Sequence, residues 1–206
     1  MQYQREATQD EVVWVFLEGE YRSARFGGEL REAMARGGCP PKAILEPDLQ
    51  SAEENALRQR VLGAYRGWGR NTDLFEGFPP VARWQRFRFE EGDLDRLRYV
   101  RYSYWDEISC FTGRPRSAAP VIRQGREIFE VSNAPFLEGE AFLRGGGSFP
   151  PLIAVTDGGP DIILLEGHSR ATIYALAPEF FPGTACYLGL CEAKALEAWA
   201  GPPLEP

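Results

Sequence analysis

The sequence has little of what usually marks an exported, membrane-bound or metal-binding protein. Its longest apolar run near the start, Val12–Leu17, is far shorter than the roughly 20 residues that a membrane-spanning helix needs. The first ten residues are polar and show no secretory signal, so we expect a cytoplasmic protein with no membrane partner. No Cys-x-x-Cys pair occurs, so we expect reduced thiols and no metal site at the four cysteines, Cys39, Cys110, Cys186 and Cys191.

Lysine and histidine are also scarce. Only Lys42 and Lys194 are lysines, so the rest of the 23 basic residues are arginines, and His168 is the only histidine. Arginine suits bidentate recognition of phosphate and carboxylate, but codon bias explains its excess equally well. Because 30 acidic residues give a net charge of −7, a general nucleic-acid binder is disfavoured. A single histidine and the lack of Gly-x-Ser-x-Gly disfavour a protease or esterase.

The chain nevertheless has enough apolar residues for a real core. It has 206 residues, of which 44% are hydrophobic. It contains no internal repeat and no low-complexity linker. We therefore expect a single compact domain, residues 1–206, in which an N-terminal α/β extension (1–117) wraps on a C-terminal core (118–206).

In the N-terminal half, apolar residues predict two strands and two helices. Val12–Leu17 and Trp84–Phe89 are predicted strands, and Gly28–Arg36 is a predicted short helix. Ser51-x-x-Glu54 is a capping-box pattern ahead of a helix that runs to about residue 65.

Between Asp93 and Ile108 the spacing of apolar residues predicts a further helix, and 117–124 is weakly patterned. Asp93 is expected to cap this helix, and the apolar residues would all lie on one side of it. The residues of that side are Leu94, Leu97, Val100, Tyr104 and Ile108.

The last third of the chain alternates more regularly between strands and helices. Asp157-Gly158-Gly159-Pro160 is a tight-turn sequence, and the apolar run after it indicates a strand buried on both faces. The predicted elements are a short helix after Pro135, strands Pro150–Val155 and Asp161–Leu165, a helix Arg170–Ala177, a strand Ala185–Leu190 and a helix Glu192–Ala200.

The turn Glu166–Arg170 lies where the strand Asp161–Leu165 meets the next helix. A helix N-terminus carries unpaired N–H groups and a partial positive charge, and Gly167 would let a ligand approach them closely. Ser169 and Thr172 add hydroxyl groups and Arg170 adds a fork of donors. This arrangement predicts a phosphate-binding turn. In the alternative interpretation Ser169 merely caps the helix, and Glu166 and Arg170 form a surface pair.

The segment around this turn resembles the phosphate-binding core of the ParB/sulfiredoxin superfamily. Members have a short helix, a strand, a turn and a second strand, followed by Gly-x-x-Arg that opens a helix with alanine soon after. Here that motif is Gly167–Ala171, and Ala185–Leu190 falls where the family has its next strand. The resemblance spans roughly Ala118–Leu190, about a third of the chain. It implies an α+β fold, a ParB/sulfiredoxin-like core with a mixed sheet and flanking helices.

The resemblance implies nucleotide binding with diverse outcomes. The family's sulfinic-acid reductases place cysteine directly after the motif glycine, where this chain has His168. Its DNA clamps carry a helical region after the core, whereas this acidic chain continues only about 30 residues past the motif. What remains is phosphoryl transfer or nucleotide hydrolysis on a small-molecule substrate. The alternative is a non-catalytic, nucleotide-gated module that contacts a protein partner.

Each residue of the turn receives a hypothetical role. Gly167, Ser169, Arg170, Ala171 and Thr172 would hold the phosphates of ATP, ADP or CTP. His168 would donate a hydrogen bond to the phosphoryl group or act as acid or base. Glu166 would hold Mg²⁺ through a water or orient a hydroxyl nucleophile.

Two further constellations are weaker. Ser109, Thr112, Arg114 and Arg116 are candidates for substrate or ligand contacts, or form an ordinary polar loop. Arginines alternate with aromatics across 84–105, a pattern that suits single-stranded nucleic acid. Acidic residues lie among them and aromatics at helical spacing are usually core, so nucleic acid is the less favoured partner.

Overall fold

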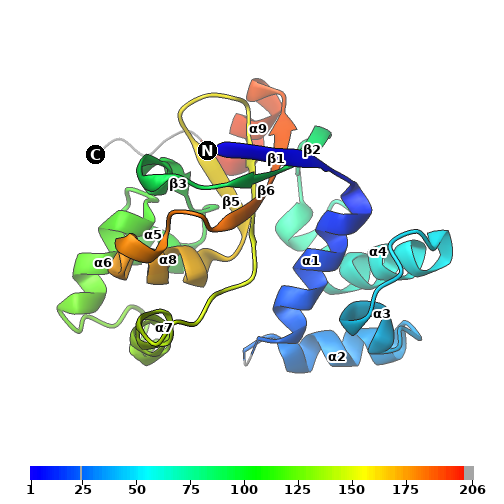
Figure 1. Cartoon of the computed structure of the whole chain (residues 1–206), viewed down its shortest axis with the longest axis horizontal. Coiled ribbons are helices and arrows are strands. Elements are labelled where there is room, and N and C mark those ends of the chain that lie inside the picture. Colours follow the sequence, from blue (N-terminus) through cyan, green and yellow to red (C-terminus); the bar gives the residue numbers. More distant parts are fainter. Residues whose placement is uncertain (24, 202–206) are drawn as a thin grey trace. The chain divides into compact units, whose positions relative to one another are not determined.

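The computed structural model describes residues 1–23 and 25–201, which fall into two compact units (Figure 1). One, the helical unit, is Ala7–Pro80. The other, the sheet unit, joins Met1–Glu6 to the chain from Val81 onward. This division differs from the expected boundary between residues 117 and 118, because 81–117 belong to the same unit as the C-terminal strands.

The helical unit consists of short helices packed around α1. Thr8 caps α1 by accepting a hydrogen bond from the N–H of Glu11 at 3.1 Å, and α2, α3 and α4 all contact α1. Ser51 caps α4 in the same way, with the N–H of Glu54 as donor. The elements are α1 (Gln9–Tyr21), α2 (Gly27–Arg36), α3 (Lys42–Leu45), α4 (Ala52–Arg66) and the 3₁₀ turn η1 (Asp73–Phe75).

The predicted strand Val12–Leu17 is wrong, because these residues form the middle of α1. Short apolar runs do not distinguish a buried strand from a buried helix. The Thr8 cap, with Asp10 and Glu11 in the first turn, starts a helix that buries most of the run. Tertiary packing therefore overrides the β preference of the valines.

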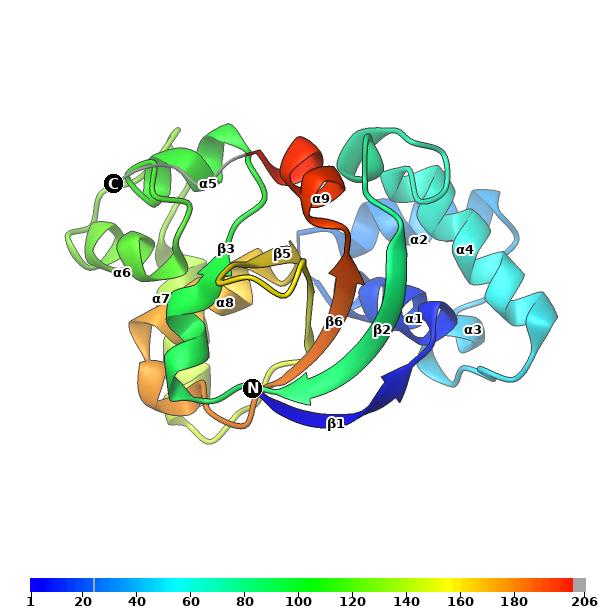
Figure 2. The same ribbon diagram turned by 90° about the horizontal axis from the view of Figure 1, so that it is seen from above.

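The sheet unit is built on one mixed six-stranded sheet within the described residues, in the order β1-β2-β6-β4-β5-β3. The pairs β2–β6 and β4–β5 are antiparallel, and β6–β4 and β5–β3 are parallel. Figure 2 shows β2 between β1 and β6. The strands are β1 (Gln2–Ala7), β2 (Val81–Arg88), β3 (Leu97–Arg98), β4 (Leu152–Thr156), β5 (Ile162–Glu166) and β6 (Ala185–Cys191).

Helices α6 and α7 both pack on α8, on the same side of the sheet (Figure 1). Gly139 of α7 permits a close approach, since a Cβ there would lie 2.3 Å from Cδ1 of Ile173. The helices of this unit are α5 (Ser103–Ile108), α6 (Pro115–Arg123), α7 (Ala134–Arg144), α8 (His168–Leu176) and α9 (Ala193–Ala200), with the 3₁₀ turns η2 (Glu91–Arg96) and η3 (Pro178–Phe180).

The single helix predicted from Asp93 to Ile108 is wrong. The chain forms η2, the short strand β3 and then α5. The side chains of Glu90 and Asp93 each accept the other's N–H and so form a capping box at the start of η2. The carboxylate of Asp93 also pairs with the Met1 amine at 2.8 Å. Leu97 is extended and pairs with Ile162 of β5. The apolar residues of the predicted helix therefore reach the core from η2, β3 and α5 instead of from one helix.

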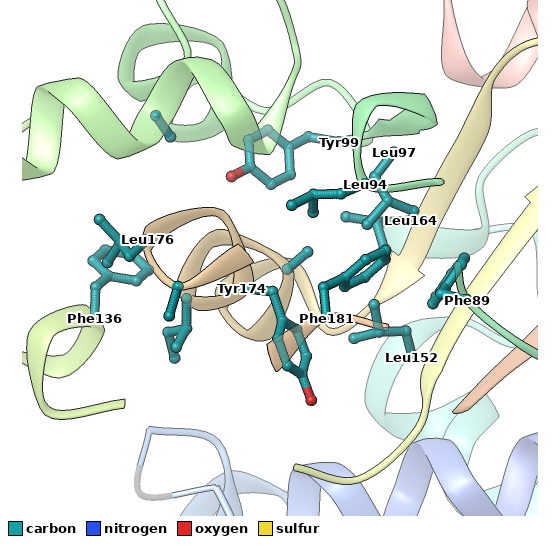
Figure 3. Packing of buried hydrophobic residues seen from close by; sticks show 14 of the residues in the cluster. Phe89, Leu94, Leu97, Tyr99, Phe136, Leu152, Leu164, Tyr174, Leu176 and Phe181 are labelled. Carbon is teal, nitrogen blue, oxygen red and sulfur yellow. The ribbon is translucent and has the colours of Figure 1, made fainter. Parts of the chain in front are cut away.

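The core of the sheet unit lies between the sheet and α6–α8. Figure 3 shows Leu152 and Leu164 of the sheet near Tyr174 and Phe181, with Leu176 and Phe136 alongside. The rings of Phe89 and Phe181 stack at 4.8 Å. This packing fixes the β5–α8 connection, which carries the predicted site.

The other predicted elements are confirmed to within about three residues, the largest difference being the start of β2 at Val81 rather than Trp84. The mixed sheet with flanking helices confirms the α+β class. No helix in residues 1–23 and 25–201 is both long and apolar enough to cross a membrane.

Candidate functional site

The candidate site is the start of α8, directly after β5. Gly167 is its N-cap, with a left-handed φ of 96°. A Cβ at Gly167 would lie 2.5 Å from Cδ2 of Leu152, so glycine is needed for both backbone conformation and space. The first helical hydrogen bond runs from the N–H of Ala171 to the carbonyl of Gly167 at 2.9 Å.

Arg170 is engaged inside the protein. Its Nη1 donates to the carbonyls of Pro150 and Pro151 at 2.8 and 2.6 Å, and its Nη2 pairs with the carboxylate of Glu166. Both side chains of this pair are only 13% exposed. Arg170 therefore ties the entry of β4 to the end of β5. The pair that the sequence offered as the alternative does form, but it is largely buried rather than on the surface.

Thr172 and Ala171 lie on the buried side of α8. The hydroxyl of Thr172 donates to the carbonyl of His168 at 2.8 Å and lies 2.5 Å from the hydroxyl of Tyr99. Burial raises the pKa of Tyr99, so its phenol stays protonated and donates to Thr172. The Thr172 hydroxyl is thus used within the core.

His168 is half-buried against aromatic rings. Its ring stacks near those of Tyr99 and Trp105, with centroids 5.8 and 5.4 Å away, and its Nε2 accepts the N–H of Val100 at 3.4 Å. Burial lowers the pKa of His168 to about 3, so the imidazole is neutral at pH 7. With Nε2 as acceptor, the proton is assigned to Nδ1.

The first turn of α8 has donors without acceptors. No side chain caps the helix, because its N-cap is glycine. Ser169, the second residue of the helix, is exposed. Within the described part of the chain, the N–H groups of His168 and Ser169 meet no acceptor. Ser169 is therefore not the helix cap that the sequence allowed.

Ser109 and Thr112 are used in their own loop. Ser109 is fully buried; its hydroxyl lies 2.6 Å from the carbonyl of Trp105 and accepts the N–H of Gly113 at 3.0 Å. The hydroxyl of Thr112 donates to the carbonyl of Ser109 and accepts the N–H of Arg114. These contacts match the polar-loop interpretation.

The two arginines of the same loop are also paired. Nη2 of Arg114 lies 2.6 Å from Asp161, and its Nη1 donates to the carbonyl of Arg96 at 3.1 Å. Arg116 makes an exposed ion pair with Asp95 at 2.8 Å. Arg98 also contacts Asp161, so this carboxylate serves two guanidinium groups at the start of β5.

The aromatic partners of His168 were not singled out as site residues by the sequence. Tyr99 and Trp105 lie in the arginine–aromatic stretch, which the sequence favoured as core. Tyr99 is indeed buried, and its ring lies 4.7 Å from that of Trp105. The alternation of arginines and aromatics was the available signal, but it did not link them to the turn 60 residues later.

Fold and site together define an α+β protein with an uncapped helix N-terminus beside an aromatic cluster. Comparison with family models, curated proteins and solved structures finds no match to the chain. Within residues 1–23 and 25–201, no three His, Cys, Asp or Glu side chains are grouped to hold a metal ion.

Proposed function

We propose that the chain binds a nucleotide by its phosphates at the first turn of α8 and acts as a non-catalytic, nucleotide-dependent binding module. The observation that carries the proposal is the pair of main-chain N–H groups at His168 and Ser169, which follow a glycine cap and meet no acceptor in the described chain. Such donors at a helix N-terminus, with the positive end of the helix dipole, suit a phosphate.

The surrounding groups support an anionic ligand. Ser169, the second residue of the helix, is exposed and its hydroxyl is a further donor. The first turn of α8 has no acidic residue, and the nearest carboxylate, Glu166, is paired with Arg170. The choice of a nucleotide among anions rests on the ParB/sulfiredoxin-like order of strands and Gly-x-x-Arg.

The side chains favour binding over catalysis. His168, with a pKa lowered to about 3, is a poor general base at pH 7, and its Nε2 is already an acceptor. Glu166 is engaged by Arg170 and is not free to orient a nucleophile. In this proposal Mg²⁺ would arrive with the phosphates of ATP, ADP or CTP. A protein partner would then bind the nucleotide-bound and nucleotide-free protein with different affinities.

A proline substitution at Ser169 tests the role of the main-chain donors. Ser169→Pro removes the N–H and the hydroxyl, whereas Ser169→Ala removes the hydroxyl alone. The helix should tolerate the change, because α7 already has Pro135 at its second position. By calorimetry with ATP, ADP and CTP plus Mg²⁺, we expect Ser169→Pro to bind about 10- to 100-fold more weakly, the loss of one charged hydrogen bond.

The control for this experiment is Ser169→Ala. Ser169→Ala should lose at most about threefold in affinity, since only an exposed hydroxyl changes. Equal affinity of Ser169→Pro and Ser169→Ala would contradict main-chain binding. Release of phosphate from ATP by the unaltered protein, abolished in His168→Phe, would favour the phosphotransferase or hydrolase alternative.

A further inference from the structure

The turn Ile128–Val131 has an unusual backbone for its residues. The N–H of Val131 donates to the carbonyl of Ile128 at 3.0 Å, and the two residues form an isolated antiparallel bridge. Between them, Phe129 and Glu130 have φ values of 51° and 60°. Two central residues of positive φ are typical of a type I′ turn, in which Asn-Gly is the preferred sequence.

Phe129 and Glu130 therefore cost more conformational energy at these two positions than Asn-Gly would. Bulky residues rarely adopt the left-handed region, because Cβ crowds the backbone. Residues held there often belong to functional surfaces. Phe129 does not recover the cost by burial, since it is 62% exposed.

The neighbouring apolar side chains are exposed as well. Val131 is 39% exposed, and Leu137, in the first half of α7, is 42% exposed. Together with Phe129, these side chains lie within nine residues of the same turn and helix start. We call Phe129, Val131 and Leu137 with the carboxylates beside them the acidic–apolar surface.

Those carboxylates are Glu127, Glu130 and Glu138, all exposed and none in an ion pair within the described chain. The nearby arginines Arg123 and Arg144 do not neutralise them, because both pair with Glu140, at 2.6 and 2.8 Å. Arg126 is the one basic residue of residues 126–138, so this surface carries a net negative charge.

We infer that the acidic–apolar surface is a docking site for a basic amphipathic segment of a partner protein. An apolar stripe on the partner would cover Phe129, Val131 and Leu137, and arginines or lysines beside the stripe would meet the three carboxylates. Charge complementarity selects this occupant over nucleic acid or an anionic membrane, both of which the carboxylates repel.

Two synthetic peptides of matched apolar pattern test the docking site, one with lysines and one with glutamates on the polar face. We expect the basic peptide to bind the full chain at least tenfold more tightly, by fluorescence anisotropy, and to weaken as salt rises. Phe129→Asn should weaken this binding at least tenfold without lowering the melting temperature, because asparagine accepts the left-handed conformation. Glu127/Glu130/Glu138→Gln should remove most of the salt dependence.

A matched control comes from the other end of α6. Phe111 is also exposed (53%) and also has a positive φ, 63°, but it precedes the helix whereas Phe129 follows it. Phe111→Asn should leave peptide affinity unchanged. The inference is overturned if the two peptides bind equally, if neither binds, or if Phe129→Asn and Phe111→Asn behave alike.

The test also separates other occupants and is independent of the nucleotide proposal. Binding to phosphatidylserine vesicles in preference to the basic peptide would overturn the inference in favour of a membrane. A dimer by ultracentrifugation that Phe129→Asn dissociates would assign the surface to a second copy. Neither the peptides nor these variants involve Ser169, so a negative result here leaves the α8 proposal as it stands.

Discussion

The turn Glu166–Arg170 and the loop Ser109–Arg116 look alike in sequence but differ in the structure. Both combine arginine with hydroxyl residues, and in both the arginines Arg170 and Arg114 are held by carboxylates of the protein itself. The main chains differ. In the loop, side-chain hydroxyls accept the N–H groups of Gly113 and Arg114, whereas at the start of α8 those of His168 and Ser169 meet no acceptor in the described chain.

The comparison shows that residue type alone did not reveal where ligand-binding capacity lies. Arginine is the residue expected to hold a phosphate, yet Arg170 holds carbonyls and Glu166. The glycine cap of α8 offers no side-chain acceptor to the first N–H groups of the helix, whereas the Ser109 hydroxyl accepts the N–H of Gly113 in its loop.

The largest effect is expected at Arg170. Arg170→Ala would leave Glu166 without its partner and two prolyl carbonyls without a donor, so we expect a loss of about 3 kcal/mol in the free energy of unfolding. Urea unfolding measures this. At a temperature where the variant is folded, its affinity for ATP should fall less than that of Ser169→Pro. A stable variant with abolished ATP affinity would instead make Arg170 a phosphate ligand.

A smaller loss is expected in the loop. Ser109→Ala leaves the N–H of Gly113 without its acceptor in a fully buried position, which costs about 2 kcal/mol. Ser169→Ala is the matched control, because Ser169 is exposed, and it should stay within about 0.5 kcal/mol of the parent. If both serine variants unfold at the same urea concentration, the contrast between the two regions fails.

The sequence predicted most of the fold where short-range rules operate. Ser51 and Glu54 predicted the start of α4, and Asp157–Pro160 predicted the turn between β4 and β5. The sequence did not predict the structure where contacts between distant segments determine the backbone conformation. Leu97 is extended because β5 offers a partner strand, and no local pattern near Asp93 shows that strand.

The sequence predicted that a helix follows the strand at the turn Glu166–Arg170, whereas ligand binding at this turn stays a prediction. Gly167, expected to let a ligand approach the main chain, is the N-cap of α8 with a left-handed φ of 96°. The environment of His168 could not be predicted, because Tyr99 and Trp105 come from a segment about 60 residues away. Burial, which lowers its pKa, is a tertiary property that spacing does not contain.

The smallest effect is expected from the pH dependence of His168, which sharpens the contrast between binding and catalysis. The pKa is about 3 in the folded chain and about 6.5 when the chain unfolds, so the unfolded state binds a proton first as the pH falls. The stability that neutral His168 contributes is complete above pH 6.5 and is lost as the pH falls from 6.5 toward 3. Because the ring is half-buried, we expect about 1 kcal/mol of loss between pH 7 and pH 5.

His168→Phe isolates this contribution, since it keeps an aromatic ring beside Tyr99 and Trp105 but cannot titrate. Urea unfolding at pH 7 and pH 5 gives the loss for each protein, and carboxylates elsewhere contribute equally to both. The parent should lose about 1 kcal/mol more than the variant. An equal loss would mean that His168 titrates normally in the folded chain, which would return it to the acid or base role that the buried imidazole argues against.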